Sequence, residues 1–397
     1  MTSELSSLCS YAKGKVSVDT LSKRNYVSTE NMMPNKGGIV DAGALPSAQY
    51  TQQYIKDDIL VSNIRPYFKK IWMADDDGGC SNDVLVFRAD RGCDSTFLYY
   101  ILANDAFFNY ASATSKGTKM PRGDKTAIMQ YKVPCFNYET QLRIGKLLRS
   151  IDDRIAVNKK INDNLQQQAQ ALFKKWFIDN PDAALWQEGT FSDLIEKTIS
   201  GDWGKDKPSG NNTEMVYCIR GADIPEVRAG NKGKMPIRYI LPKNFASKQL
   251  VNGDIVVEIS GGSPTQSTGR AAAISSSLLA RYDKGMVCTN FCKALKPITG
   301  YSMYVYHYWQ YLYDRGVFFS YENGTTGIKN LDISGFIETE PIFIAPAELV
   351  KKFDTFCQSV FSKVYANGLE SEQLALVRDT LLPKLMSGEI DVNDIRL

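Results

Sequence analysis

A heptad pattern that occurs twice, 209 residues apart, constrains this 397-residue chain more than any other feature. Its positions step by four and three residues, which is the pattern that packs one helix lengthwise against another. The first copy consists of Ile144, Leu148, Ile151, Ile155, Asn158, Asn162, Leu165, Ala169, Leu172 and Trp176. The second copy consists of Phe353, Cys357, Val360, Val364, Asn367, Ser371, Leu374, Arg378, Leu381 and Leu385.

The two copies predict two long helices that form one antiparallel pair. A helix from residue 139 to residue 177 would be about 58 Å long. Polar residues in such a seam cost stability but fix the register. We therefore expect Asn158 near Ser371 and Asn162 near Asn367, with Arg378 extending to the edge of the seam. Pro383 should kink or end the second helix. The alternative is that each helix packs only on its own domain.

The segments before the two helices also resemble each other, and the shared order of their short motifs indicates a duplication. Both copies continue through an aromatic-rich helix, predicted at 97–110 and 301–313, and then a glycine loop and a strand with a proline. The matching strings start at Tyr26 and Val216, Lys56 and Asn252, Cys80 and Cys288, and Ser115 and Asn323, and the strands carry Pro134 and Pro341.

These patterns predict an α+β fold with two similar globular domains, separated by a pair of long antiparallel coiled-coil helices, with internal pseudo-two-fold symmetry. The boundaries are residues 1–137 for the first globular domain, 138–178 for a central helical spacer, 179–345 for the second globular domain and 346–397 for a distal helical spacer.

Motifs for independent catalysis are missing from the sequence. The single histidine, His307, argues against a histidine-based nucleophile or a multi-histidine metal site. The glycine-rich stretch 261–270 has the wrong spacing for a phosphate-binding loop. Residues 75–86 lack the glutamate that ends a calcium loop. We predict no catalytic residue, no metal site and no cofactor.

The first residues of the chain and the spacing of its cysteines indicate the cellular compartment in which we expect the protein. The chain starts without an apolar run after a basic patch, and no stretch approaches the roughly 20 apolar residues that span a bilayer. The eight cysteines form no CxxC motif. We expect reduced thiols in a cytoplasmic protein that has no membrane partner.

The charge is small overall but concentrated locally. The net charge is only +3, yet residues 227–253 contain six basic residues and no acid. Residues 115–125 contain four basic residues against Asp124. Local basic patches of this kind can contact DNA phosphates in a protein that is not strongly basic as a whole.

Several strings resemble the specificity subunits of type I restriction–modification systems. They begin at Tyr26 (YVSTENM), Glu139 (ETQLRI), Gly253 (GDIV), Gly324 (GTT) and Asp379 (DTLLPKLMSGEI). The resemblance implies that each globular domain is a target recognition domain that reads one half of a split, asymmetric site in double-stranded DNA. It also implies that the helices set the unread gap and dock two methyltransferase subunits, that restriction subunits join for cleavage, and that this chain is not itself an enzyme.

Residues for DNA contact are predicted from their chemistry, since Lys, Arg and loop amides bind phosphates, and Arg, Asn and Gln read base edges. Arg65 and Arg270 each follow one of two equivalent predicted strands, which favours both as contact residues. The predicted DNA-binding residues are Arg65, Lys69, Lys70, Lys116, Lys119, Arg122, Arg228, Lys232, Lys234, Gln266, Arg270, Thr325, Thr326 and Lys329. The alternative for each one is an ordinary solvated surface residue.

Two other functions are compatible with the sequence. One is a stand-alone coiled-coil DNA-binding protein that has no nuclease partner. The other is a two-headed coiled-coil scaffold that binds proteins and no nucleic acid.

Overall fold

The computed structural model describes residues 2–263, 265–324 and 328–395, and the chain divides into two compact units. The first unit consists of Met1–Asp153 with Leu374–Leu397, and the second of Arg154–Gln373. The two long helices, α4 (Tyr138–Phe173) and α10 (Ala347–Ser387), each contribute residues to both units.

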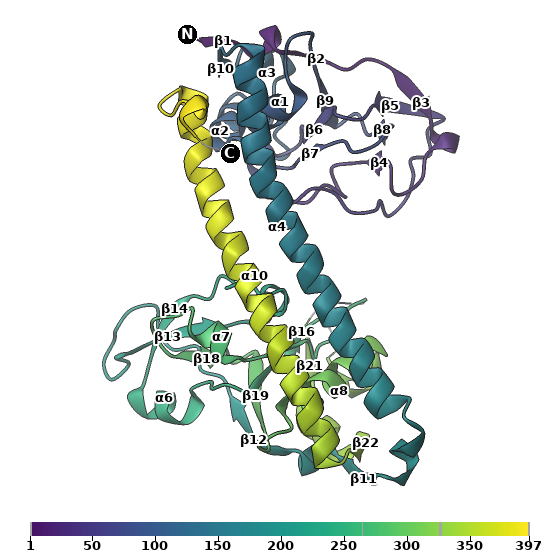
Figure 1. The fold of residues 1–397 in the computed structure, drawn as a ribbon, viewed down its shortest axis with the longest axis vertical. Helices are drawn as coiled ribbons and strands as arrows, with labels where there is room; N and C mark the ends of the chain where they lie inside the picture. The colour runs from purple at the N-terminus through teal and green to yellow at the C-terminus, as the bar shows by residue number, and fades with distance from the viewer. Residues whose placement is uncertain (1, 264, 325–327, 396–397) are drawn as a thin grey trace. The chain divides into compact units, whose positions relative to one another are not determined.

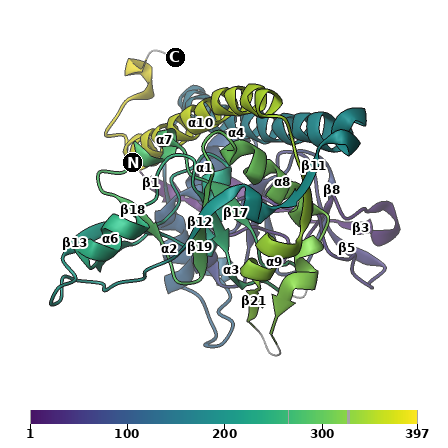
Figure 2. The same cartoon turned by 90° about the horizontal axis from the view of Figure 1, so that it is seen from below.

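Each unit is built on an antiparallel four-stranded sheet with the same topology. In the first unit the order is β2 (Cys9–Tyr11), β9 (Val84–Ala89), β6 (Ile59–Ser62) and β7 (Ile71–Met73). In the second unit it is β12 (Ile195–Ser200), β19 (Cys292–Pro297), β15 (Ile255–Glu258) and β17 (Ala271–Ala273). Figure 2 labels three strands of this second sheet, β12, β19 and β17.

Smaller sheets and helices surround these strands. The first unit adds the sheet β3 (Lys15–Ser17), β5 (Tyr50–Tyr54), β8 (Gly78–Cys80), β4 (Tyr26–Val27) and the pair β1 (Thr2–Glu4), β10 (Lys132–Pro134). The second unit adds β14 (Ile237–Ile240), β13 (Glu214–Ile219), β18 (Met286–Cys288), then β16 (Ser260–Gly261), β21 (Lys329–Leu331), β20 (Glu322–Asn323), and the pair β11 (Gln187–Thr190), β22 (Pro341–Ile344). The shorter helices are α1 (Ser95–Ala103), α2 (Asp105–Ala113), α3 (Lys125–Met129), α5 (Ile224–Arg228), α6 (Pro242–Lys248), α7 (Ser276–Leu279), α8 (Ser302–Asp314) and α9 (Ile333–Thr339).

A buried aspartate, paired with a partly exposed basic side chain, occupies the same place in both four-stranded sheets. Asp58 precedes β6 and accepts hydrogen bonds from Arg88 on β9 at 2.8 and 2.6 Å. Asp254 precedes β15 and accepts from Lys296 on β19 at 3.0 and 2.9 Å. The aspartates are 1% and 3% exposed, and each also accepts from the backbone N–H three residues earlier. The sequence match between these two segments therefore reflects one repeated packing solution.

A second repeated feature follows the parallel strand pairs. Strand β4 pairs in parallel with β8, and β13 pairs in parallel with β18. After β4, the Ser28 N–H donates to the Asn31 side chain at 2.6 Å, and after β13 the Arg220 N–H donates to Asp223 at 3.1 Å. The two turns have the same hydrogen bond but different side chains at the first position.

The aromatic helix predicted at 97–110 is wrong as a single element, because the chain breaks it into α1 and α2. Asn104 has extended backbone angles, and its side chain accepts from the Ala106 N–H at 2.9 Å. An asparagine that caps a new helix competes with continuation of the old one. The second aromatic helix, predicted at 301–313, is the single helix α8.

In the second unit, α4 and α10 run antiparallel (Figure 1). Polar side chains of the seam form hydrogen bonds between the two helices. Asn158 donates to Ser371 Oγ at 3.3 Å, and Asn367 donates to Asn162 Oδ1 at 2.8 Å. Asn162 in turn donates to the backbone carbonyls of Val364 and Ala229 at 2.9 and 3.1 Å. The Asn162 and Asn367 amides are therefore paired with each other inside the seam, whereas the buried Asn158 Oδ1 has no hydrogen-bond partner among the described residues.

In the first unit, the remaining parts of the two helices pack together through apolar side chains. Ile144 and Leu148 belong to one core cluster with Leu385. Arg378 extends to Asp152, with 2.6 Å between Nη1 and Oδ1. The helix α10 continues to Ser387, so Pro383 does not end it.

The other seam positions of the two units are buried or half-buried: Ile151, Ile155, Leu165, Leu172, Phe353, Val360, Val364, Leu374 and Leu381.

His307 belongs to the core of the second unit. Its Nδ1 lies 2.8 Å from Gln170 Oε1 on α4, and its ring packs against Phe353 on α10 with 5.2 Å between ring centroids. Burial lowers the pKa of His307 to about 3, so the ring is neutral at physiological pH. Among the described residues, no helix is long and apolar enough to cross a membrane.

The seam amides give a prediction for stability. Asn162→Leu or Asn367→Leu should each cost about 1–3 kcal/mol, because each leaves the other amide buried with fewer partners. The double variant should cost less than the sum of the two, by about 0.5–3 kcal/mol. Urea unfolding followed by tryptophan fluorescence measures this, since Trp176, Trp186, Trp203 and Trp309 all lie in the second unit.

Asn164→Leu is the matched control, because Asn164 lies on the same helix but is exposed. Its effect should stay within about 0.5 kcal/mol. Additive losses from the two seam substitutions would show that the two amides do not act as a pair.

Candidate nucleic-acid interface

Three loops meet at one end of the four-stranded sheet in the first unit, and we call this place the first junction. Its segments are residues 63–70 after β6, 81–83 after β8 and 115–123 before α3. The Asn63 N–H donates to the Asp83 carbonyl at 2.8 Å, and the Gly123 N–H donates to the Asn63 carbonyl at 3.1 Å. The Arg65 N–H donates to the Pro121 carbonyl at 2.8 Å. Backbone hydrogen bonds thus join two loops in which the sequence predicted DNA contacts.

The second unit has the same arrangement, which we call the second junction. Its segments are residues 259–270, 289–291 and 322–331, of which 264 and 325–327 lie outside the described residues. The Ile259 N–H donates to the Phe291 carbonyl at 2.9 Å, and the Leu331 N–H donates to the Ile259 carbonyl at 2.8 Å. These bonds match those of Asn63, so the two junctions have the same backbone connections.

Backbone strain gathers in the first junction. Arg65 and Lys69 have left-handed φ angles of 50° and 52°, although neither is a glycine. Asn35 and Lys36 are also left-handed, and their N–H groups donate to the carbonyls of Phe68 and Lys69 at 2.8 Å. Such conformations cost energy and persist where surrounding contacts hold them, often at functional sites.

The predicted cations of the first junction differ in how firmly they are held. Lys69 Nζ is 2.8 Å from Asp105, and Lys116 Nζ is 2.5 Å from Asp124. The Lys116 ammonium holds the pKa of Asp124 below its usual value. Arg122 Nη2 is 3.0 Å from Asp83, in a half-exposed pair. These ion pairs lie at the surface, where they contribute little stability and can exchange partners.

The other three predicted cations of this junction have different surroundings. Lys70 donates to the Thr29 carbonyl, and burial lowers its pKa. Lys119 is exposed, and Arg65 is half-buried beside Lys70 in a cavity of about 220 Å³. The first junction therefore brings together all six residues that the sequence predicted in this unit.

In the second junction, Arg270 is bound in a bidentate pair. Its Nε and Nη2 donate to Glu258 at 2.8 and 2.7 Å, and the Glu258 side chain is only 7% exposed. Gln266 can place its amide oxygen 2.9 Å from the same Nε. Arg65 and Arg270 do follow equivalent strands, β6 and β15, but they occupy different positions in the loops after those strands. Arg270 corresponds instead to Lys70, because Arg270 directly precedes β17 and Lys70 directly precedes β7. The Arg270 carbonyl accepts a hydrogen bond from the Glu258 N–H, and the Lys70 carbonyl accepts one from the Ser62 N–H.

The remaining predicted residues of the second unit do not gather at one place. Lys329 lies in the junction, 2.7 Å from Glu322. Thr325 and Thr326 lie outside the described residues. Arg228 lines a separate cavity of about 330 Å³ together with His307 and Gln310.

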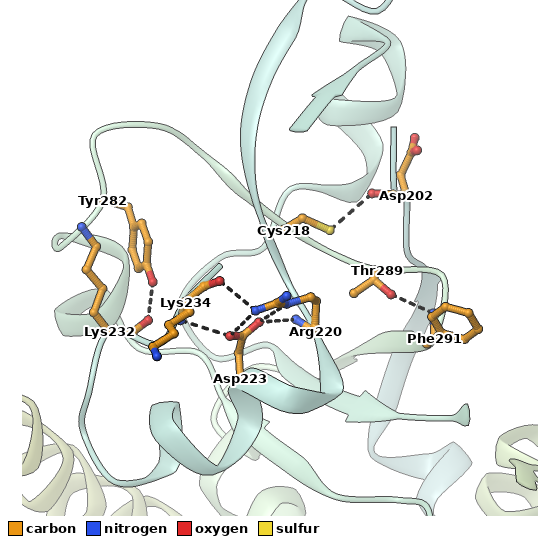
Figure 3. A network of polar contacts seen from close by, with 9 residues as sticks. All are labelled: Asp202, Cys218, Arg220, Asp223, Lys232, Lys234, Tyr282, Thr289 and Phe291. Atoms are coloured by element: carbon orange, nitrogen blue, oxygen red, sulfur yellow. Dashed lines mark hydrogen bonds and ion pairs between the residues drawn. The ribbon is translucent and has the colours of Figure 1, made fainter. Parts of the chain in front are cut away.

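Lys232 and Lys234 lie in a segment that Arg220 binds through the Lys234 carbonyl. The Lys232 ammonium lies 4.6 Å from the centroid of the Tyr282 ring. Arg220 donates to Asp223 at 2.9 Å and to the Lys234 carbonyl at 2.8 Å. Figure 3 shows this Arg220–Asp223 pair between the lysine segment and the loop that carries Phe291. Arg220 is not among the residues predicted from the sequence to contact DNA, although it directly follows a strand that is repeated in both units.

Comparisons with known proteins find sequence similarity over most of the chain. Residues 1–167 match the family model described as the type I restriction modification DNA specificity domain. The chain is 27% identical over 330 residues to the type I restriction enzyme MjaIX specificity subunit of Methanocaldococcus jannaschii, covering 77% of this chain and 71% of that protein. It is 24% identical to the HindI specificity subunit of Haemophilus influenzae, covering 92% of this chain and 94% of that protein.

One solved structure shares the fold. It is the crystal structure of the type I restriction–modification system S subunit from M. genitalium, with a TM-score of 0.59 and 16% identity. The match covers 97% of this chain and 96% of that chain. The resemblance found in the sequence is therefore confirmed.

The ion pair in the second junction gives a prediction for stability. Arg270→Met should cost about 3 kcal/mol, because it leaves the Glu258 carboxylate buried without its partner. Adding Glu258→Gln should recover most of the loss. Lys70→Met at the corresponding place should cost only about 1 kcal/mol, because the acceptor there is a neutral carbonyl. Urea unfolding measures all three, and an Arg270→Met variant as stable as the parent would contradict the prediction.

Proposed function

We propose, because this chain belongs to the family of type I restriction–modification specificity subunits, that it recognises a two-part, asymmetric sequence in double-stranded DNA. Each unit reads one half of the site through its junction. The observation that carries the proposal is that both junctions share their backbone connections but differ in their side chains. One fold used twice with different side chains can read two different half-sites.

The side chains of the first junction have the chemistry that duplex DNA requires. Lys119, Arg65 and the partly exposed Arg122 supply cations and guanidinium groups, which bind phosphates and guanine edges. The surface ion pairs of Lys69 and Lys116 exchange for phosphate contacts at little cost. In the second unit, Lys329 of the junction and the 232–234 segment outside it supply the corresponding charges.

The α4–α10 pair would hold the two units about a local two-fold axis, so that their separation sets the unread gap between half-sites. The chain needs no catalytic group for this role. We propose that methyltransferase subunits supply adenine methylation and that restriction subunits supply cleavage, as the resemblance implies.

Exposed apolar side chains support a docking role for the helices. In the second unit, Val157 and Ile161 are 45% and 37% exposed one turn apart on α4, and Leu369 on α10 is 43% exposed. Apolar side chains on otherwise polar helices are suited to a protein interface. We propose that this surface contacts a methyltransferase subunit.

DNA recognition is tested by mapping N6-methyladenine in the genome of a host that expresses the complete system. We expect one motif with two half-sites and a fixed gap. Arg65→Ala with Lys119→Ala should reduce or relax recognition of one half-site only, and Lys329→Ala should affect only the other. A contiguous motif, or an equal effect of both variants on both half-sites, would contradict the assignment of one junction to each half-site.

Docking is tested by copurification with the methyltransferase subunits. Val157→Asp with Ile161→Asp should reduce recovery of the complex at least tenfold, because the interface would have to bury two unpaired carboxylates. Lys160→Asp is the matched control on the same helix, where an exposed charged side chain is replaced by another. Undiminished copurification of the double variant would place the docking surface elsewhere.

A further inference from the structure

A cavity of about 520 Å³ lies beside the second junction, and none of the residues that line it were predicted from the sequence to contact DNA. The main ones are Trp203, Arg220, Glu258, Ser260, Asn290 and Phe291. The volume falls within the range of about 300–1,000 Å³ that is usual for small-molecule sites. The cavity combines two aromatic rings with several hydrogen-bonding groups.

Phe291 presents an exposed ring on a fixed backbone. Its side chain is 62% exposed, yet its carbonyl accepts from the Ile259 N–H at 2.9 Å and its N–H donates to Thr289 Oγ1 at 3.0 Å. Figure 3 shows the ring beyond Thr289, at the end of its loop. An aromatic ring held in this way can stack on a partner with little loss of conformational entropy.

The other side chains of the cavity are also held in place before any ligand binds. The Arg238 guanidinium lies 4.0 Å from the centroid of the Trp203 ring, and Arg238 donates to the Trp203 carbonyl at 2.8 Å. Arg220 is oriented by two hydrogen bonds to Asp223, at 2.9 and 3.1 Å. Aromatic faces for stacking, with a guanidinium and an amide for edge contacts, are the chemistry that recognises a nucleobase.

We propose that this cavity binds one unstacked base of the DNA at the second half-site. The inference rests on the proposed function, because it assumes that DNA lies on the second junction. The cavity is continuous with that surface, since Phe291 and Ser260 belong to both. Lys232 and Lys234, across the Arg220–Asp223 pair, would bind the phosphates on either side of the displaced nucleotide.

The first unit differs at the corresponding position. Asp83 takes the place of Phe291, and its carboxylate is 3.0 Å from Arg122. A carboxylate offers no stacking surface and repels phosphates unless its partner neutralises it. Capture of a base is therefore expected only at the second half-site.

The test uses the specificity chain in complex with its methyltransferase subunits, and duplexes that carry the mapped site. Each base pair of the second half-site is replaced in turn by a mismatch, and the dissociation constant is measured. At one position the mismatch should tighten binding several-fold, because unpairing no longer opposes capture. Phe291→Ala should remove this gain and weaken binding of the matched duplex by about tenfold or more. Phe291→Tyr should keep the mismatch gain and the affinity for the matched duplex.

Asp83→Ala is the matched control and should leave the mismatch gain unchanged. A gain caused by the methyltransferase active site would persist in Phe291→Ala, so it is distinguished from the proposed one. Equal weakening of matched and mismatched duplexes by Phe291→Ala, with both half-sites still recognised, would overturn the base cavity and leave the proposed function intact. If the parent complex does not recognise the second half-site at all, the proposed function itself fails.

Discussion

The buried hydrogen bond between Asn162 and Asn367 constrains how α4 and α10 pack in the second unit. An amide in an apolar helix seam must find a partner there, so it permits only the register that brings the two together. Asn162 also donates to the Ala229 carbonyl, which anchors the turn after α5 against the helix pair. Gly230 and Gly368 allow this approach, because a Cβ on Gly368 would overlap the Gly230 carbonyl.

The effect of this register extends toward the candidate DNA surface. The turn at Gly230 leads directly to Lys232 and Lys234, and Arg220 binds the Lys234 carbonyl. A shift of the seam would move this segment relative to the junction loops of the same unit. The polar residues of the seam therefore serve the recognition surface as well as the helix pair.

The two junctions show how one backbone plan can carry two specificities. Two ion pairs with buried aspartates, Asp58 with Arg88 and Asp254 with Lys296, occupy the same place in the sheet of each unit. The loops keep their backbone hydrogen bonds, while Asp83 in one unit becomes Phe291 in the other. Side chains at the loop ends can change without cost to the sheet, because they do not take part in its packing.

The two heptad seams, the order of the repeated strands and the family could be predicted from the amino-acid sequence, since their motifs are short, local and repeated in the same order. The loops of Arg65 and Arg122, which meet in the folded chain, could also be predicted as DNA contacts from their residue types. The pairing of Arg270 with Glu258, the division of the aromatic helix at Asn104 and the shared cavity of Trp203 and Phe291 became known only from the folded structure. Ion pairs and cavities depend on residues distant in sequence, whose contacts no local period encodes.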